Sequence, residues 1–333
     1  MGFTMNFTKV QGAGNDFVLV ETSNVDRDWS PLAIAICDRH FGVGADGLLL
    51  LLPSDTANFQ MRVFNPDGSE AKACGNGLRC LIKYVVDRKL VNTGTQEILV
   101  ETMSGVRKAR LHYNAKLEQQ NSKGRLNSGE PVTIQVSMGQ PEFGAEDIPV
   151  AIGQDKGERW SRGSLKGLRP FKTYTSPSPF KGEGDKGGEV DIKSMLSYPV
   201  TIGGKELLLD LISMGNPHAV YFWQHPVSDF PLSQLGPKVE QLAIFPNGVN
   251  FEVARVVSRE QIEVRVWERG VGETLACGSG ACAVAVAAQR HGYIDNKVDI
   301  KLPGGILNVE WGGVGEVFLN GPAEIVFSGE WPD

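Results

Sequence analysis

Ala73-Cys74-Gly75-Asn76-Gly77 and Ala276-Cys277-Gly278-Ser279-Gly280 are nearly the same pentapeptide, in opposite halves of the chain. The second leads into residues 281–288, whose small apolar side chains predict a helix that is buried on most sides. The first leads into apolar residues at helical spacing, namely Leu78, Leu81, Ile82, Val85 and Val86. Sequence typical of strands precedes and follows each pentapeptide. A duplicated strand–loop–helix unit, one in each of two domains, is the simplest account.

The sequence around these two helices predicts short strands separated by turn residues. They are expected at 7–11, 17–21, 48–52, 61–64, 98–102, 106–113, 132–136, 207–212, 219–222, 250–257, 261–267, 298–302, 306–309, 317–319 and 324–327. Strands mixed with helices indicate an α/β (α+β) fold. Two similar halves are expected to face each other across a cleft, and clefts between domains are favoured ligand sites.

Residues 153–191 differ from the rest of the chain. They are rich in Gly, Lys, Pro, Ser and Glu, with Ser176-Pro177-Ser178-Pro179 in the middle. Such a composition buries too little apolar surface to offset the entropy lost on ordering. We predict an exposed insertion or long loop, and a linker between domains is the alternative.

Composition bounds the class of protein. The 333 residues correspond to about two domains, and 41% hydrophobic residues are enough for a sizeable core. A net charge of −6 disfavours non-specific binding to nucleic acid or to an anionic membrane. There is neither an apolar run of about 18 residues nor a secretory signal at the start. We therefore expect a soluble cytoplasmic chain; a transit peptide removed earlier would leave no trace, so the plastid stroma is the alternative compartment.

The five cysteines form no C-x-x-C pair and no dense framework, so neither a disulfide scaffold nor a metal site is expected. Cys37, Cys80 and Cys282 are interpreted as buried apolar fillers. Cys74 and Cys277 differ because each begins a helix, where free amides and the helix dipole stabilise a thiolate and lower the thiol pKa. Their flanking glycines allow the backbone amides to approach an anion closely. Two such cysteines face to face predict inversion at a carbon beside a carboxylate: one sulfur removes a proton and the other delivers one to the opposite face.

Several other residues are candidates for the same site. Glu268 continues the face of an alternating strand, where a carboxylate needs a partner or a ligand; a solvated Glu268–Arg269 pair at a frayed strand end is the alternative. Arg269 is suited to binding a carboxylate in a bidentate manner. His218 is either a structural hydrogen-bonding residue or part of the site. Four asparagines in Gly- or Pro-containing turns are either turn formers or ligands: Asn15, Asn65, Asn216 and Asn250. Asp46 and Asp67 are interpreted as turn residues.

At this point the sequence resembles the diaminopimelate epimerase family. The matching stretches occur in family order over nearly the whole chain: 12–17, 41–47, 64–70, 73–77, 215–218, 249–251, 267–270, 272–274 and 276–281. Gly47 departs from the pattern, because many members have Gln there. The combined motifs are highly specific, whereas any one alone is weak.

The resemblance implies a cofactor-independent enzyme that interconverts LL- and meso-2,6-diaminopimelate in lysine and peptidoglycan-precursor synthesis, with one thiolate and one thiol. It implies two pseudo-two-fold-related domains, 1–127 and 128–320, each with strands around a central helix, and a last strand, 321–333, that returns to the first domain. A homodimer is also implied. Cys74 and Cys277 become the acid/base pair. The remaining residues would bind the substrate: Gly75, Asn76, Gly278 and Ser279 its reacting carboxylate, and Asn15, Asn65, Asn216, Asn250, Glu268 and Arg269 its amino and carboxylate groups, including the distal ones.

Three alternatives remain. A proline or hydroxyproline racemase shares the two-cysteine architecture, but Arg269 and the four asparagines argue against it, since a small cyclic amino acid has no distal carboxylate. A thiol redox protein in which Cys74 and Cys277 form a reversible disulfide is the second. A non-catalytic amino-acid-binding protein is the third.

Overall fold

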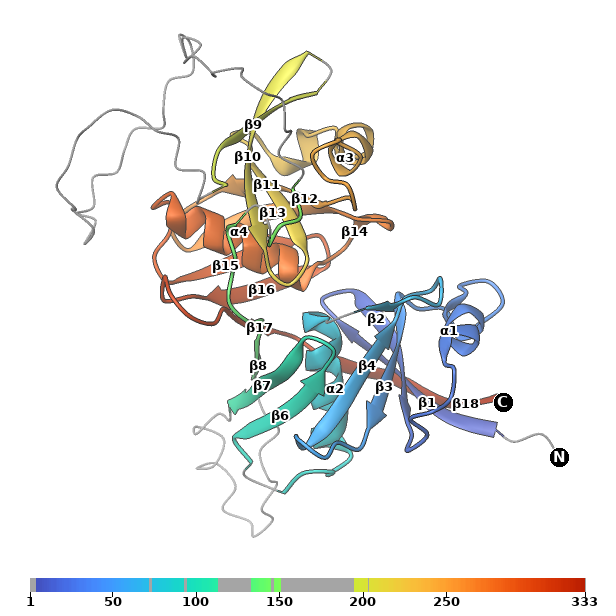
Figure 1. Cartoon of the computed structure of the whole chain (residues 1–333). Helices are drawn as coiled ribbons and strands as arrows, with labels where there is room; N and C mark the ends of the chain where they lie inside the picture. The colour runs from blue at the N-terminus through green and yellow to red at the C-terminus, as the bar shows by residue number, and fades with distance from the viewer. Residues whose placement is uncertain are drawn as a thin grey trace.

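The computed structural model describes residues 4–71, 74–92, 95–112, 133–144, 147–150, 195–202 and 204–332. Figure 1 shows two lobes, each with a helix lying among curved strands: α2 in one lobe and α4 in the other. The predicted α/β fold of two similar halves is therefore confirmed. The segment predicted as an insertion, 153–191, lies outside the described residues.

The two lobes contain the same order of elements. The first comprises β1 (Thr4–Gly12), β2 (Asn15–Glu21), α1 (Ser30–Cys37), β3 (Gly47–Leu52), β4 (Phe59–Phe64), β5 (Glu70–Ala71), α2 (Gly75–Asp87), β6 (Glu97–Thr102), β7 (Gly105–His112) and β8 (Thr133–Ser137). The second comprises β10 (Lys205–Ser213), β11 (Pro217–Phe222), η1 (Val227–Asp229), α3 (Leu232–Glu240), β12 (Asn250–Val256), β13 (Gln261–Glu268), β14 (Gly272–Thr274), α4 (Gly278–Arg290), β15 (Lys297–Leu302), β16 (Gly305–Glu310) and β17 (Phe318–Gly321).

Strand pairing repeats in the same way. The steps β1–β2, β3–β4 and β6–β7 are antiparallel, whereas β2–β3 and β4–β6 are parallel. The second lobe repeats this with β10–β11, β12–β13 and β15–β16 antiparallel, and β11–β12 and β13–β15 parallel. Even the short strands correspond, because β5 pairs with β4 and β14 with β13, each directly before its central helix. The duplicated pentapeptide thus occurs at the same point of a duplicated strand order, at the start of each central helix.

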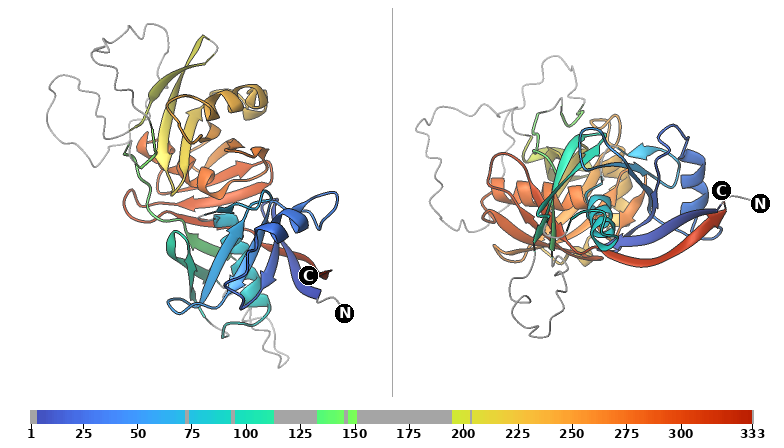
Figure 2. Two further views of the ribbon diagram at one scale, coloured as in Figure 1. Left: turned by 45° about the vertical axis from the view of Figure 1, so that its right-hand side comes forward. Right: turned by 90° about the horizontal axis from the view of Figure 1, so that it is seen from below.

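Three pairings complete the ends of the repeat. β9 (Tyr198–Ile202) pairs with β10, and β18 (Glu324–Pro332) pairs with β1, antiparallel in both cases. Figure 2 shows β18 running beside β1 although the two are at opposite ends of the chain. β8 pairs with β17, so one continuous sheet passes from lobe to lobe.

The central helices share one hydrophobic core. Residues of α2, such as Leu81 and Val85, and of α4, such as Ala283 and Val286, belong to the same buried cluster. The segment Ala281–Ala288 of α4 is buried throughout, as its sequence predicts. The outer helices α1 and α3 cover two smaller clusters. Within the described ranges, every helix is too short or too polar to cross a bilayer.

Candidate active site

Cys74 and Cys277 are the N-cap residues of α2 and α4. Both have extended backbone, with φ −145° and ψ 111° at Cys74 and φ −123° and ψ 116° at Cys277. The amide of Gly77 donates to the Cys74 Sγ at 3.3 Å, and the amide of Gly280 donates to the Cys277 Sγ at 3.4 Å. Each sulfur therefore takes the place that a hydroxyl or carboxylate oxygen usually has at a helix start. The structure brings these cysteines into equivalent positions in the two lobes.

The N-terminal ends of α2 and α4 contact each other. The Asn76 Nδ2 donates to the carbonyl oxygen of Ala276 at 3.3 Å. A Cβ atom built on Gly278 would lie 3.2 Å from the Asn76 Oδ1, and one on Gly75 would lie 2.5 Å from the Met138 Sδ. The helix starts thus pack closely at the glycines beside the cysteines, and their amides are held near one another.

Asn15 joins this group through its side-chain amide. Its Oδ1 accepts from the Asn76 Nδ2 at 3.1 Å, and its own Nδ2 donates to the Asp46 Oδ2 at 2.8 Å. Asp46, interpreted from sequence as a turn residue, therefore also fixes the orientation of Asn15. Arg39 donates to Asp46 at 2.7 Å and so holds that carboxylate in place.

Asn216 and Ser279 meet in the second lobe. The Asn216 Nδ2 donates to the Ser279 Oγ at 3.4 Å, which leaves the Asn216 Oδ1 to accept from the His218 Nε2 at 3.0 Å. The His218 Nδ1 lies 2.7 Å from the Glu252 Oε1, and both side chains are fully buried. The hydrogen bond from His218 thus fixes the orientation of the Asn216 side chain. Glu252 was missed from the sequence, although a charged residue in the otherwise apolar run 251–254 was a usable signal.

Glu268 ends β13 beside Cys277. Its Oε1 accepts from the Thr274 Oγ1 at 2.5 Å, and its charge raises the pKa of the Cys277 thiol. Because Glu268 pairs with Gly272 across β13 and β14, it lies within a hairpin and not at a frayed strand end. Thr274 is a second residue that the sequence reading missed.

Asn250 and Arg269 lie next to each other at the edge of this group. The Asn250 Nδ2 donates to the Pro217 carbonyl at 2.9 Å, and its Oδ1 accepts from the Arg269 amide at 3.0 Å. The exposed Arg269 guanidinium donates to the Asn247 carbonyl at 3.1 Å. Asn65 is exposed and donates to the Ser69 Oγ at 2.9 Å, and none of its described contacts reaches the cysteines.

Gly47, which begins β3, has no room for a side chain. A Cβ built there would lie 2.8 Å from the carbonyl oxygen of Phe64 and 3.3 Å from the Phe17 ring. A glutamine at this position would therefore require a shift of the backbone.

Burial raises the pKa of both cysteine thiols. For Cys74 it raises the pKa to about 11, against the opposing effects of the Gly77 amide and Arg79. For Cys277 burial, together with the charges of Glu268 and Glu252, raises the pKa well above its usual value. The helix-start amides do lower these pKa values, as expected from the sequence, but desolvation of the thiolate outweighs them, so the net pKa is raised and not lowered. Burial also raises the pKa of the Glu268 carboxyl, against the hydrogen bond from Thr274.

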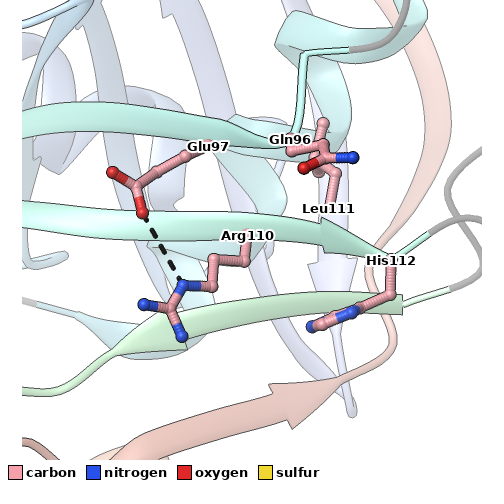
Figure 3. Close-up of a pocket in the computed structure, with 5 residues that line it drawn as sticks. All are labelled: Gln96, Glu97, Arg110, Leu111 and His112. Atoms are coloured by element: carbon pink, nitrogen blue, oxygen red, sulfur yellow. Dashed lines mark ion pairs between the residues drawn. The ribbon is translucent and has the colours of Figure 1, made fainter.

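A separate surface hollow lies at the ends of β6 and β7. It is lined by Gln96, Glu97, Arg110, Leu111 and His112, with Arg110 and Glu97 paired at 3.6 Å (Figure 3). None of the candidate site residues belongs to it. Among the described residues, no group of three or more His, Cys, Asp or Glu is arranged to hold a metal ion.

The fold places the chain in a structural class of two-lobed proteins that includes epimerases and racemases. It is similar to the crystal structure of a hydroxyproline epimerase from Agrobacterium vitis, with TM-score 0.64 and 13% identity over 99% of this chain and 93% of that one. It is also similar to a phenazine biosynthesis protein of the PhzF family from Bacillus anthracis, with TM-score 0.62 and 15% identity over 99% of both chains.

Sequence comparison identifies the family within that class. The diaminopimelate epimerase family model matches residues 7–134 and 211–326. Curated diaminopimelate epimerases are similar over nearly the full length: 39% identity for that of Pelotomaculum thermopropionicum, covering 98% of this chain and 99% of that one, and 40% for that of Acetivibrio thermocellus, covering 98% of both. The chain belongs to the diaminopimelate epimerase family.

Proposed function

We propose that this chain interconverts LL-2,6-diaminopimelate and meso-2,6-diaminopimelate, and thus acts in the synthesis of lysine and peptidoglycan precursors. The observation that carries the proposal is the pair of cysteine N-caps on two contacting helices. Membership of the diaminopimelate epimerase family identifies the substrate class.

The proposed reaction moves one proton on and another off the same carbon. The thiolate of one cysteine removes the α-proton and becomes a thiol, and the electron pair left on carbon delocalises into the adjacent carboxylate. The thiol of the other cysteine then delivers its proton to the opposite face and becomes the thiolate. The two sulfurs exchange roles in the reverse direction, so no proton is gained or lost.

The amides at the two helix starts are suited to the charge that builds up on the carboxylate. In our proposal, Gly75 with Asn76 and Gly278 with Ser279 bind its oxygens through backbone N–H groups, where the positive ends of both helix dipoles meet. Desolvation makes the thiolate costly to form. For the same reason, a thiolate that has formed is a strong base. The high thiol pKa is therefore useful, because an α-proton beside a carboxylate is itself only weakly acidic.

Glu268 is proposed to help form the first thiolate. It interacts electrostatically with Cys277, and burial raises the pKa values of both groups. A carboxyl with a raised pKa accepts a proton more readily, so Glu268 and the two sulfurs can share one negative charge. Arg269 and the asparagines Asn15, Asn65, Asn216 and Asn250 are proposed to hold the amino and distal carboxylate groups. Proline has no distal carboxylate for these residues to bind, which argues against a proline racemase.

We propose the division into two domains, 1–127 and 128–320, with the last segment, 321–333, completing the first. The pairing of β18 with β1 supports the return of the last segment to the first domain. β8, which pairs with both β7 and β17, lies just past the proposed boundary, at the junction of the two lobes. We further propose a cytoplasmic homodimer, as the family resemblance implies; sedimentation equilibrium of the purified chain tests the dimer.

The deciding experiment is exchange of the substrate α-hydrogen with D₂O. We expect deuterium uptake and inversion with diaminopimelate and none with proline or 4-hydroxyproline. Exchange with proline alone would assign the chain to the racemases instead. Binding of diaminopimelate without exchange would indicate an amino-acid-binding protein, and a reversible Cys74–Cys277 disulfide without any exchange would indicate a redox protein.

A further inference from the structure

Arg79, on the second turn of α2, is a fully buried arginine. Its side chain has 0% exposure and is among the largest buried side chains of the protein. A Cβ built on Gly321 would lie 3.1 Å from its Cζ and its Nε, and one built on Gly12 would lie 3.6 Å from its Nη2. A side chain at position 321 would therefore crowd the guanidinium, whereas one at position 12 would only touch it. An arginine is rarely buried, because desolvating a permanent cation is costly.

The Arg79 guanidinium has no carboxylate partner among the described residues. Its Nη2 donates to the Asn76 Oδ1 at 2.6 Å, whereas its Nε and Nη1 are buried without a hydrogen-bond partner in the part of the chain that the structure describes. Three sulfurs would interact favourably with its charge when ionised, those of Cys80, Cys74 and Cys282. Of these, Cys80 and Cys282 have 0% exposure and their thiols have pKa values raised by burial to about 12 or beyond. Cys74 is the one sulfur of the three that the proposed reaction ionises.

The single hydrogen bond of Arg79 also determines how Asn76 is oriented. An arginine only donates, so the Asn76 Oδ1 must face it and the Nδ2 must face the other way. That Nδ2 donates to the Asn15 Oδ1 at 3.1 Å and to the Ala276 carbonyl at 3.3 Å. Ala276 directly precedes Cys277. Arg79 therefore helps to position, through the side-chain amide of Asn76, both Asn15 and the loop that contains Cys277.

We propose that Arg79 is a positioning residue of the epimerisation: its buried guanidinium orients Asn76 and supplies the fixed positive charge that balances the thiolate at Cys74. The inference rests on the proposed function. A buried cation without a carboxylate is stabilised when an anion forms beside it, and in this site that anion forms only during turnover. Among the described residues, Cys74 is influenced by two charged side chains: Arg79 on α2 favours the thiolate and Glu268 on β13 opposes it.

The test measures the reactivity of Cys74 without substrate. Arg79→Met removes the charge but keeps an unbranched side chain. Lys83→Met is the matched control, because it removes a cation from the same helix where Lys83 pairs with Asp87 at 2.8 Å near the surface. Only the thiolate reacts with iodoacetamide, so the alkylation rate follows the thiolate fraction. Peptide mass spectrometry measures the alkylation of Cys74. At about pH 8.5 we expect Cys74 to react about tenfold or more slowly in Arg79→Met than in wild type, which corresponds to a rise of about one unit in the thiol pKa. Lys83→Met should react like wild type.

A purely structural role predicts the opposite sign. Loosening the core would expose Cys74 and speed its alkylation, whereas loss of the positive charge slows it. Arg79→Lys, which keeps the charge, should restore most of the rate. With diaminopimelate, Arg79→Met should lower kcat and leave KM within about twofold, because the charge acts as the reaction proceeds.

Arg79→Gln is the second neutral variant, and it should also slow alkylation. The inference is overturned if Cys74 reacts at the wild-type rate or faster in a folded neutral variant, or if neither neutral variant folds, since Arg79 would then serve the core alone. Alkylation requires no turnover. If the wild-type protein fails to exchange diaminopimelate but alkylation of Cys74 is slowed in Arg79→Met, the proposed function is refuted and the charge effect of Arg79 stands. Normal exchange with unchanged alkylation would refute the role of Arg79 alone.

Discussion

The side-chain amide of Asn76 reaches the carbonyl oxygen of Ala276, 3.3 Å away, across 200 residues of sequence. Asn76 belongs to the first turn of α2, and Ala276 directly precedes the N-cap of α4. This contact ties the two cysteine-bearing helix starts together. A change at either pentapeptide is therefore expected to affect both lobes.

Cys74→Ala and Cys277→Ala should each lower the epimerisation rate by about 10²–10⁴, the range for loss of a general acid or base. Both should fold, since little buried volume is lost. Each should retain slow α-hydrogen exchange from one stereoisomer, catalysed by the remaining sulfur, and NMR in D₂O measures this. Cys282→Ala, on the same helix as Cys277, is the control and should keep near wild-type turnover. An alanine variant at position 74 or 277 with a near wild-type rate would show that the two-base assignment is wrong.

Glu268→Gln should change turnover and thiol reactivity in opposite directions. The charge of Glu268 raises the thiol pKa values of Cys74 and Cys277, so its removal should speed alkylation of Cys74 in the substrate-free protein. Turnover should fall by about 10² or more, because the proton acceptor beside Cys277 is lost. Glu273→Gln is the control, since Glu273 lies on the same hairpin but pairs with Arg265 at 2.8 Å. Slower alkylation of Cys74 in Glu268→Gln would contradict the assigned charge effect.

Asp16 should make the protein sensitive to acid. Burial raises its pKa, but hydrogen bonds from Arg39 and Lys9 outweigh burial and lower the pKa from 3.8 to about 2. A depressed carboxyl pKa contributes stability that is fully present above the unfolded value and is lost as the pH falls toward the folded value. Asp16→Asn should therefore lower the free energy of unfolding by about 2 kcal/mol at neutral pH. The deficit should shrink between about pH 4 and pH 2.

Urea denaturation at several pH values measures this difference. Asp55→Asn, at an exposed position, serves as the control and should be nearly neutral. A deficit in Asp16→Asn that stays constant down to about pH 2 would mean that packing, and not the charge network, accounts for it.

Chelators should leave the activity intact. The proposed reaction uses only sulfur, amide and carboxylate groups of the chain itself, together with the substrate. Turnover should therefore survive exhaustive dialysis against EDTA and should not depend on added pyridoxal phosphate. Activity that is lost on dialysis and returns with a metal would refute this.

Residues 160–190 should be dispensable for folding. Their composition buries little apolar surface, so replacing them with a short Gly/Ser linker should leave the thermal unfolding midpoint and most of the turnover unchanged. Calorimetry and the exchange assay measure the two separately. A shortened protein that folds but has lost turnover would assign this segment a part in the reaction.

Every strand predicted from the sequence is present, most with one or two further residues at an end, because alternating and buried apolar runs are local signals. α1 and α3 were missed for different reasons. The sequence of α1, SPLAIAIC, is too short and too uniformly apolar to show a helical period. α3 contains Gly236 and Pro237, which normally argue against a helix. The glycine is there because a Cβ would lie 2.5 Å from the Trp267 ring, a contact visible only in the folded chain.

The sequence by itself determined the duplication, the two central helices and the cysteines at their starts, since each depends on residues within about two helical turns. The tertiary structure alone decided the electrostatics of the site. Whether a helix-start thiol has a lowered or a raised pKa depends on how completely distant segments exclude water from it, and here that exclusion dominates at Cys74 and Cys277. Likewise, Glu252 behind His218 and Arg79 behind Asn76 were ordinary charged residues in the sequence. Once buried away from water, Glu252 and Arg79 must interact with His218 and Asn76, and they thereby orient these site residues. Burial depends on the whole fold and not on a local segment, so the sequence does not show it.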